Sequence, residues 1–284
     1  MAGLLSISIP AAADDKIKVV ASFSILGDMV RQVTGNLAEV TTIVGPDADA
    51  HVYTPNAADA KSVANADVIF VNGLGFETWS QTLIETSSSK AKVFVATDGI
   101  TPLKVDGEID PHAWNSLVNG MQYVANIAVS MAKINPINAV AYKANARAYN
   151  RRLKDLNNRA IDQLERLTTG QRIVVTSHDA FGYLATAYGL TFLAPVGIDT
   201  DGEPSAQDLS KLIDHLKAVS AGALFTENIT SPSLIEQIAR ETGIKIGGRL
   251  YSDALSTRGG PATTYEKLIE HNLRVLIKAL SSRS

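Results

Sequence analysis

Short apolar runs rich in β-branched residues alternate with helical patterns along almost the whole chain, and this alternation restricts the possible folds more than any other feature. Nearly continuous apolar runs of this length are typical of parallel strands that are covered on both faces. Four such runs lie in each half of the chain, at residues 17–21, 40–44, 68–71, 93–96, 173–176, 191–194, 223–226 and 244–250. The pattern predicts an α/β protein with two βα lobes, each built on a parallel four-stranded sheet.

The middle of the chain follows a different pattern. From Pro136 to about Leu167 the sequence contains no glycine, and its apolar residues recur at helical spacing until Gly170. A helix of roughly 30 residues is about 45 Å long, which is enough to span two lobes. A flexible hinge would need Gly, Ser or Pro within the segment. We therefore expect a rigid linker helix at residues 136–169, between an N-terminal lobe at 14–135 and a C-terminal lobe at 170–284.

The first residues resemble the end of a secretory signal peptide. A short apolar stretch, Leu4 to Ile9, is followed by Pro10 and three alanines, which is typical of an apolar region before a cleavage site. We expect residues 1–13 to be a residual signal peptide and the mature chain to begin at about Asp14. No stretch reaches the roughly 18–20 apolar residues of a membrane span.

Composition excludes several classes of function. The net charge of -3 argues against a nucleic-acid-binding protein, which normally carries a basic surface. The chain has no cysteine, so a thiolate zinc site, a disulfide framework and a cysteine nucleophile are all excluded. A lipid-anchoring cysteine is missing as well, and we expect a soluble protein of a Gram-negative periplasm.

Two of the five histidines and one aspartate lie at the carboxyl ends of predicted strands, where a parallel sheet binds ligands. His51 follows the run at residues 40–44 across a loop, and His178 directly follows the run that begins at Ile173. Asp253 follows the last run, and His112 precedes a long helical pattern. Ligands bind at the carboxyl ends of parallel strands, and imidazole and carboxylate are natural ligands for zinc or manganese. From this pattern alone, three ordinary hydrogen-bonded loop histidines remain an equal alternative.

Five segments of the chain resemble the motifs of one family. They are Asp49–Pro55, Ala66–Glu77, Asp110–Trp114, Val175–Tyr183 and Gly248–Leu255, in the expected order within a resemblance that covers Lys16 to Leu280. They are similar to the metal-binding solute-binding proteins of zinc/manganese ABC importers, the cluster A-I family. The resemblance implies two βα lobes bridged by a long helix, with a metal ion in the cleft between them. It also implies four ligands, His51, His112, His178 and Asp253.

The resemblance also bears on the metal and on the partners. Manganese and iron members typically carry Glu where this chain has His178, and three imidazoles with one carboxylate suit Zn²⁺ better than Mn²⁺. Zinc-specific members often carry a His-rich loop, yet residues 76–92 contain no histidine. We expect zinc, with manganese or iron as the alternatives. The family implies a monomer that delivers its ion to an ABC permease of the inner membrane, with a metallochaperone as a possible further partner.

Other residues have ordinary alternatives. Glu227 ends a predicted strand, where it could orient an imidazole or cap the next helix. His215 and His271 lie within amphipathic helical patterns, where we expect solvated or half-buried side chains. A metal-dependent hydrolase would need an open metal position. A dinucleotide-binding enzyme would need a third glycine after Gly73 and Gly75. The prediction is a binding protein that is not an enzyme.

Overall fold

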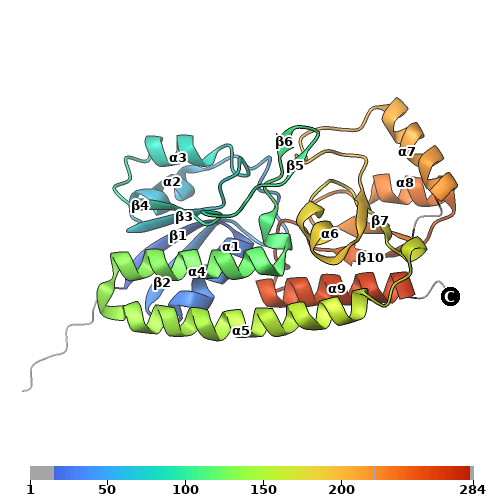
Figure 1. Cartoon of the computed structure of the whole chain (residues 1–284). Helices are drawn as coiled ribbons and strands as arrows, with labels where there is room; N and C mark the ends of the chain where they lie inside the picture. Colours follow the sequence, from blue (N-terminus) through green and yellow to red (C-terminus); the bar gives the residue numbers. More distant parts are fainter. Residues whose placement is uncertain (1–15, 220–221, 282–284) are drawn as a thin grey trace, which may run out of the picture.

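The structure of the chain, a computed structural model, describes residues 16–219 and 222–281. It contains two α/β lobes, each with a parallel four-stranded sheet, joined along one side by a long helix (Figure 1). The predicted fold is therefore confirmed. The predicted signal segment, residues 1–13, lies outside the described residues. Among the described helices, none combines the length and the apolar character that crossing a membrane requires.

The first lobe has the strand order β2-β1-β3-β4. Its strands are β1 (Ile17–Phe23), β2 (Ala38–Val44), β3 (Val68–Val71) and β4 (Lys92–Val95), and its first helices are α1 (Ser24–Thr34), α2 (Ala57–Ala64) and α3 (Ser80–Thr86). A short antiparallel pair, β5 (Lys104–Val105) and β6 (Glu108–Ile109), comes next, and the apolar pattern does not predict it. The buried run of β1 from Val19 onward explains its central place, because helices cover both faces of a doubly wound sheet.

The second lobe has the strand order β10-β9-β7-β8. Its strands are β7 (Ile173–Val175), β8 (Thr191–Leu193), β9 (Ala223–Glu227) and β10 (Ile246–Leu250). Its helices are η3 (Thr169–Gln171), α6 (Gly182–Tyr188), α7 (Ala206–Val219), α8 (Ser233–Thr242) and α9 (Tyr265–Ser281). In each sheet the first strand of the lobe lies between its second and third strands. The two lobes thus share one topology.

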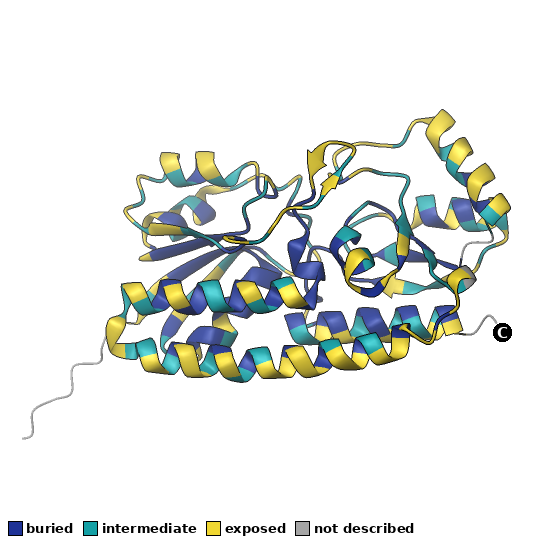
Figure 2. Ribbon diagram, viewed as in Figure 1, coloured by how far each residue is buried: buried dark blue, intermediate teal, exposed yellow. Residues whose placement is uncertain are grey.

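The helical middle of the chain forms a hairpin. Helix α4 (Leu117–Ile134) runs into η2 (Pro136–Asn138) and then α5 (Ala139–Leu164). Helix α5 packs against α1 and α4 on one side and against α6 and α9 on the other, so it runs along the base of both lobes (Figure 1). Buried residues recur at helical spacing along the inner face of α5: Tyr142, Ala146, Tyr149, Leu153, Leu156, Ala160 and Leu164. Figure 2 shows the buried side of this helix facing the lobes.

A continuous hydrophobic core extends from the first lobe through the inner face of α5 to α9. Leu153 on α5 is fully buried in this core, where replacing a leucine by alanine costs about 2–5 kcal/mol. A second, smaller core lies under α7 and α8 and consists of Val175, Ile213, Leu216, Leu224, Ile235 and Ile238. The second lobe therefore has an outer part that packs separately from the rest of the molecule.

The lobes meet at the carboxyl ends of their strands. In this contact the backbone N–H of Asp47, beyond β2, donates to the carbonyl oxygen of Leu255 at 2.8 Å. Leu255 in turn donates its N–H to Ser24 Oγ at 2.9 Å, and Asp47 Oδ2 accepts from the N–H of Thr257 at 2.9 Å. The loops that follow β2 and β10 and the start of α1 are thereby held together beside the site.

Candidate metal centre

The structure brings together the four side chains that the sequence analysis selected. His51 lies on the loop between β2 and α2, and His112 lies immediately before η1 (Ala113–Asn115), which leads into α4. His178 follows β7, and Asp253 follows β10. One ligand atom from each of the four lies within 4.8 Å of the others, and all four residues are buried there. Each lobe supplies two of them.

The spacing of these atoms can be compared with that of a bound ion. His51 Nε2 lies 3.2 Å from His112 Nε2 and 3.3 Å from Asp253 Oδ2. The other Asp253 distances are 3.1 Å, from Oδ2 to His178 Nε2, and 3.7 Å, from Oδ1 to His112 Nε2. A tetrahedral zinc ion with bonds of about 2.0–2.1 Å holds neighbouring ligand atoms about 3.3 Å apart. The arrangement therefore fits an ion of this size.

Unmet hydrogen-bonding capacity marks the centre of the cluster. Both carboxylate oxygens of Asp253 and the Nε2 atom of His178 are buried, and among the described residues their polar neighbours are the other ligand atoms of the cluster. Buried polar atoms in folded proteins are normally paired, and leaving one unpaired costs about 1–3 kcal/mol. Lone pairs directed at a shared point are what a cation requires.

Buried carboxylates orient two of the imidazoles. Asp110 Oδ1 lies 2.8 Å from His112 Nδ1 and also accepts the backbone N–H of His112 at 2.9 Å. Glu227 Oε2 lies 2.6 Å from His178 Nδ1, while its Oε1 accepts the N–H of Ser177 at 2.7 Å and that of His178 at 2.9 Å. A carboxylate on Nδ1 fixes the tautomer and leaves Nε2 free to bind metal. Two roles were predicted for Glu227, and its contacts agree with the first: its carboxylate lies against an imidazole and accepts N–H groups that follow β7, not those of the next helix.

His51 is held differently. Asp49 Oδ1 accepts the backbone N–H of His51 at 2.9 Å. The Nδ1 atom of His51 faces Asp199 Oδ1 at 3.2 Å, and the Asp199 side chain is 59% exposed. The imidazole therefore meets a carboxylate that remains in contact with solvent.

Aromatic rings surround the first-lobe side of the cluster. The Phe76 ring meets His51 edge-on at 4.8 Å between ring centroids, and Trp114 meets His112 at 5.3 Å. Trp114 Nε1 also donates to the carbonyl oxygen of Ser252 at 2.8 Å, next to Asp253. These rings exclude water, which strengthens electrostatic interactions inside the site.

The carboxylates and imidazoles perturb one another strongly. Burial acts to lower the pKa of His112, but Asp253 and Asp110 outweigh it and raise that pKa to about 9. The pKa of His178 is also raised, because Glu227 and Asp253 outweigh burial. Burial acts to raise the pKa of Asp253, but the two imidazoles hold it well below its ordinary value. Asp253 thus favours its ionised form, while His112 and His178 favour their protonated forms.

Sequence reasoning missed Asp110 and Asp199 as supporting residues. The sequence contained a signal for Asp110, because an Asp side chain often accepts the backbone N–H of the residue two positions later. Asp49 and Asp110 each precede a histidine by two residues and make this bond. No comparable signal exists for Asp199, which reaches His51 from the other lobe.

The remaining candidates lie apart from the cluster. His215 lies in α7, and His271 in α9 shares hydrogen-bonding contacts with Arg249 and Arg274. The glycine-containing loop after β3 closes on the buried carboxylate of Glu77, which accepts the N–H of Asn72 at 2.6 Å. That loop therefore directs its N–H donors to a side chain of the protein.

Comparisons with known proteins agree in family and differ in metal. The family model described as zinc-uptake complex component A, periplasmic, matches residues 19–279. The manganese-binding lipoprotein MntA of Halalkalibacterium halodurans is 34% identical over 266 residues, which are 93% of this chain and 89% of that protein. The iron-binding protein YfeA of Yersinia pestis is 34% identical over 276 residues, 95% of this chain and 88% of that protein. The structure of the periplasmic zinc-binding protein TroA of Treponema pallidum matches with a TM-score of 0.89 and 28% identity, covering 93% of this chain and 99% of that one.

Proposed function

The chain belongs to the zinc-uptake component A family, the metal-binding solute-binding proteins of ABC importers, and from this premise we propose that it captures Zn²⁺ in the periplasm for delivery to an ABC permease. The observation that supports this most is the convergence of three imidazoles and one carboxylate at the spacing of tetrahedral ligands. We propose His51, His112, His178 and Asp253 as the ligands of the transported ion. Glu227 orients one of them.

The donor set favours zinc over the alternatives. Three nitrogen donors and one oxygen donor suit Zn²⁺, whereas Mn²⁺ prefers sites richer in oxygen. The relatives are named for manganese, iron and zinc, so similarity alone leaves the choice among these ions open. The chemistry of residue 178 supports zinc, because its imidazole takes the place of a carboxylate among the donors.

Coordination by four side chains favours binding over catalysis. A catalytic zinc site usually keeps a position open for water, with a general base nearby. In this cluster Asp253 lies within 3.1–3.7 Å of the Nε2 atoms of all three imidazoles, at the distance of a fellow ligand. A metal-dependent hydrolase, the alternative of another class, would need Asp253 to act as a base instead. X-ray absorption of the zinc-loaded protein separates the two, since transport predicts three nitrogen donors, one carboxylate oxygen and no bound water.

Release requires a partner. The linker helix packs against both lobes, so spontaneous opening of the cleft is expected to be small. We propose that the permease disturbs the contact between an N-terminal lobe at residues 14–135 and a C-terminal lobe at 170–284, which the linker at 136–169 joins. The protein acts as a monomer in the periplasm of a Gram-negative cell, and a metallochaperone is a possible source of its ion.

Metal competition tests the proposal. Protein stripped of metal is titrated with Zn²⁺, Mn²⁺ and Fe²⁺, singly and in competition, and thermal unfolding is followed for each ion. An ion that binds only the folded state adds about 2.7 kcal/mol of stability at 100 times its dissociation constant. We expect zinc to displace the other two ions and Asp253→Ala to abolish the stabilisation. Tighter binding of manganese than of zinc would contradict the choice of metal, and no stabilisation by any ion would contradict the function.

A further inference from the structure

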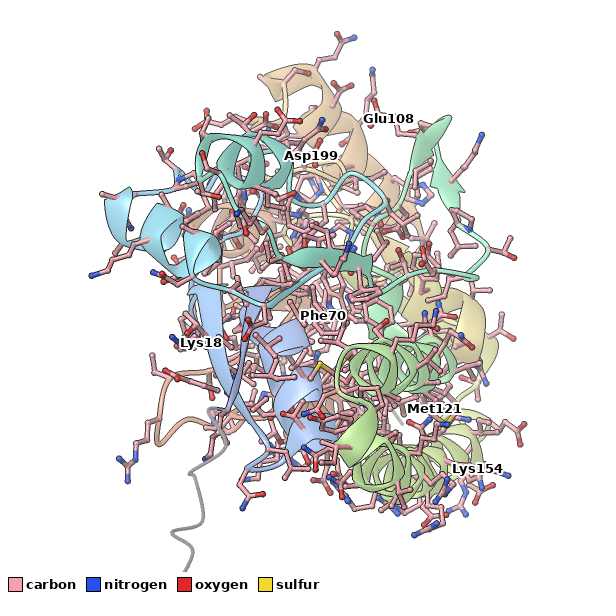
Figure 3. All side chains as sticks on the ribbon, turned by 90° about the vertical axis from the view of Figure 1, so that its left-hand side faces the viewer. Lys18, Phe70, Glu108, Met121, Lys154 and Asp199 are labelled. Carbon is pink, nitrogen blue, oxygen red and sulfur yellow. The ribbon has the colours of Figure 1, made fainter. Side chains whose placement is uncertain are left out.

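The segment that joins β8 to α7, residues 194–205, crosses from the second lobe to the first and is called the β8–α7 strap below. Its first part is fixed to the second lobe, because Val196 pairs with His178 in a parallel bridge and the N–H of Asp179 donates to Gly197 O at 3.1 Å. Its next residues reach the first lobe. Figure 3 labels Asp199 at the top of the molecule, far from Lys154 on the linker helix.

Two contacts attach the strap to the loop that carries His51. Asp199 Oδ1 lies 3.2 Å from His51 Nδ1. The neighbouring Thr200 hydroxyl donates to Asp49 Oδ2 at 2.6 Å, and the other oxygen of Asp49 accepts the backbone N–H of His51. The strap therefore contacts both the ring of His51 and, through Asp49, its backbone.

The support of His51 differs from that of the other two imidazoles. Asp110 and His112 belong to one lobe, as do Glu227 and His178, and both of these carboxylates are fully buried. These two supports are in place whether or not the lobes touch. Asp199 comes from the opposite lobe and is 59% exposed, so it reaches His51 only while the strap lies on the first lobe.

The strap also borders a cavity of about 560 Å³, whose lining includes Asp49, His178 and Thr200. Of the four clustered side chains, His178 is the one in this lining, so the cavity reaches the edge of the cluster.

We propose that Asp199 is a positioning residue that orients the His51 ring toward the metal, and that docking of the β8–α7 strap thereby controls how fast the metal leaves. This inference rests on the proposed function. Loss of a carboxylate that orients a metal-binding histidine typically weakens binding by about 10–100-fold. Because Asp199 holds the His51 ring in its orientation within the cluster, we expect the loss to fall on the dissociation rate.

Stopped-flow measurement of zinc release into excess chelator tests the inference. Asp199→Ala is expected to release zinc about 10–100 times faster than the wild type, with the association rate changed less than about twofold. Asp199→Asn keeps an acceptor oxygen at the same place and is expected to restore an intermediate rate. Thr200→Val removes the second contact and should accelerate release in the same direction.

Asp201→Ala is the matched control. Asp201 lies on the same strap, carries the same charge and makes no hydrogen bond or ion pair with any described residue, so its variant should release zinc at the wild-type rate. Release from Asp199→Ala within about twofold of wild type, or equal acceleration in Asp201→Ala, would overturn the inference. Thermal unfolding of the metal-free variants confirms that each is folded. Failure of the wild type to bind zinc would instead overturn the proposed function.

Discussion

The two lobes share a strand order, yet the same place in each sheet serves a different purpose. In both, a buried glutamate lies at or just after the carboxyl end of the lobe's third strand, Glu77 after β3 and Glu227 at the end of β9. Glu77 accepts the N–H of Asn72 and the hydroxyl of Ser22. Glu227 accepts two backbone N–H groups and contacts the imidazole of His178.

The neighbouring strand explains the difference. The first strand of the first lobe presents Ser22 to the buried glutamate, whereas the chain after the first strand of the second lobe presents His178. In the first lobe the glutamate satisfies hydrogen bonds and closes a loop. In the second lobe the buried glutamate contacts the imidazole of His178, a proposed metal ligand. The fold supplies the carboxylate, and a single residue opposite it decides what the carboxylate does.

The pH dependence of metal binding is the largest expected effect, and a histidine from each lobe contributes to it. The pKa of His112, from the first lobe, is raised to about 9, and that of His178, from the second, is raised as well. A raised pKa means that both imidazoles hold protons at neutral pH, and metal must displace them. Affinity for zinc should fall as pH falls, by about tenfold per pH unit for each proton released.

Calorimetry in buffers of different ionisation enthalpy measures the number of protons released, and competition titrations between pH 7.5 and 5.5 measure the slope. We expect one to two protons and a decline that is already present at pH 7.5. An unperturbed histidine, with a pKa of about 6.5, would give little change above pH 7. A zinc affinity that stays constant from pH 7.5 to 5.5 would contradict the prediction that zinc displaces protons from His112 and His178.

The pair of equivalent glutamates gives the next largest effect. Glu227→Gln is expected to weaken zinc binding about 10–100-fold, because it removes the charge that supports His178. Glu77→Gln should instead lower the free energy of unfolding by about 1–3 kcal/mol through its lost hydrogen bonds and leave affinity nearly unchanged. Denaturant unfolding and metal competition on both variants measure the two effects. Equal losses of zinc affinity in the two variants would contradict the claim that Glu227 supports the metal site while Glu77 supports only the fold.

The sequence predicts the local elements and the residues that cluster at the site better than it predicts the side chains that support them. Apolar runs show where strands lie, and the position of His178 after such a run indicates a ligand at the sheet edge. The antiparallel pair β5 and β6 is too short to produce a pattern. The role of Asp199 is not predicted either, because its contact with His51 depends on how the lobes pack and not on any local spacing in the sequence. Contacts within one loop leave a trace in the sequence, whereas contacts between lobes do not.

The two histidines on helices provide the smallest expected effect. His215 and His271 belong to the second lobe, as His178 does, but they lie within α7 and α9, and neither is one of the four clustered side chains. Burial and the positive charge of Arg274 lower the pKa of His271, opposite to the raised pKa values of His112 and His178 in the cluster. Replacing either by alanine should change zinc affinity by less than about twofold, because neither side chain belongs to the cluster of His51, His112, His178 and Asp253. Competition titrations of His215→Ala and His271→Ala beside His178→Ala measure this. If either helix variant lost as much zinc affinity as His178→Ala, the distinction between the clustered histidines and the two helix histidines would be wrong.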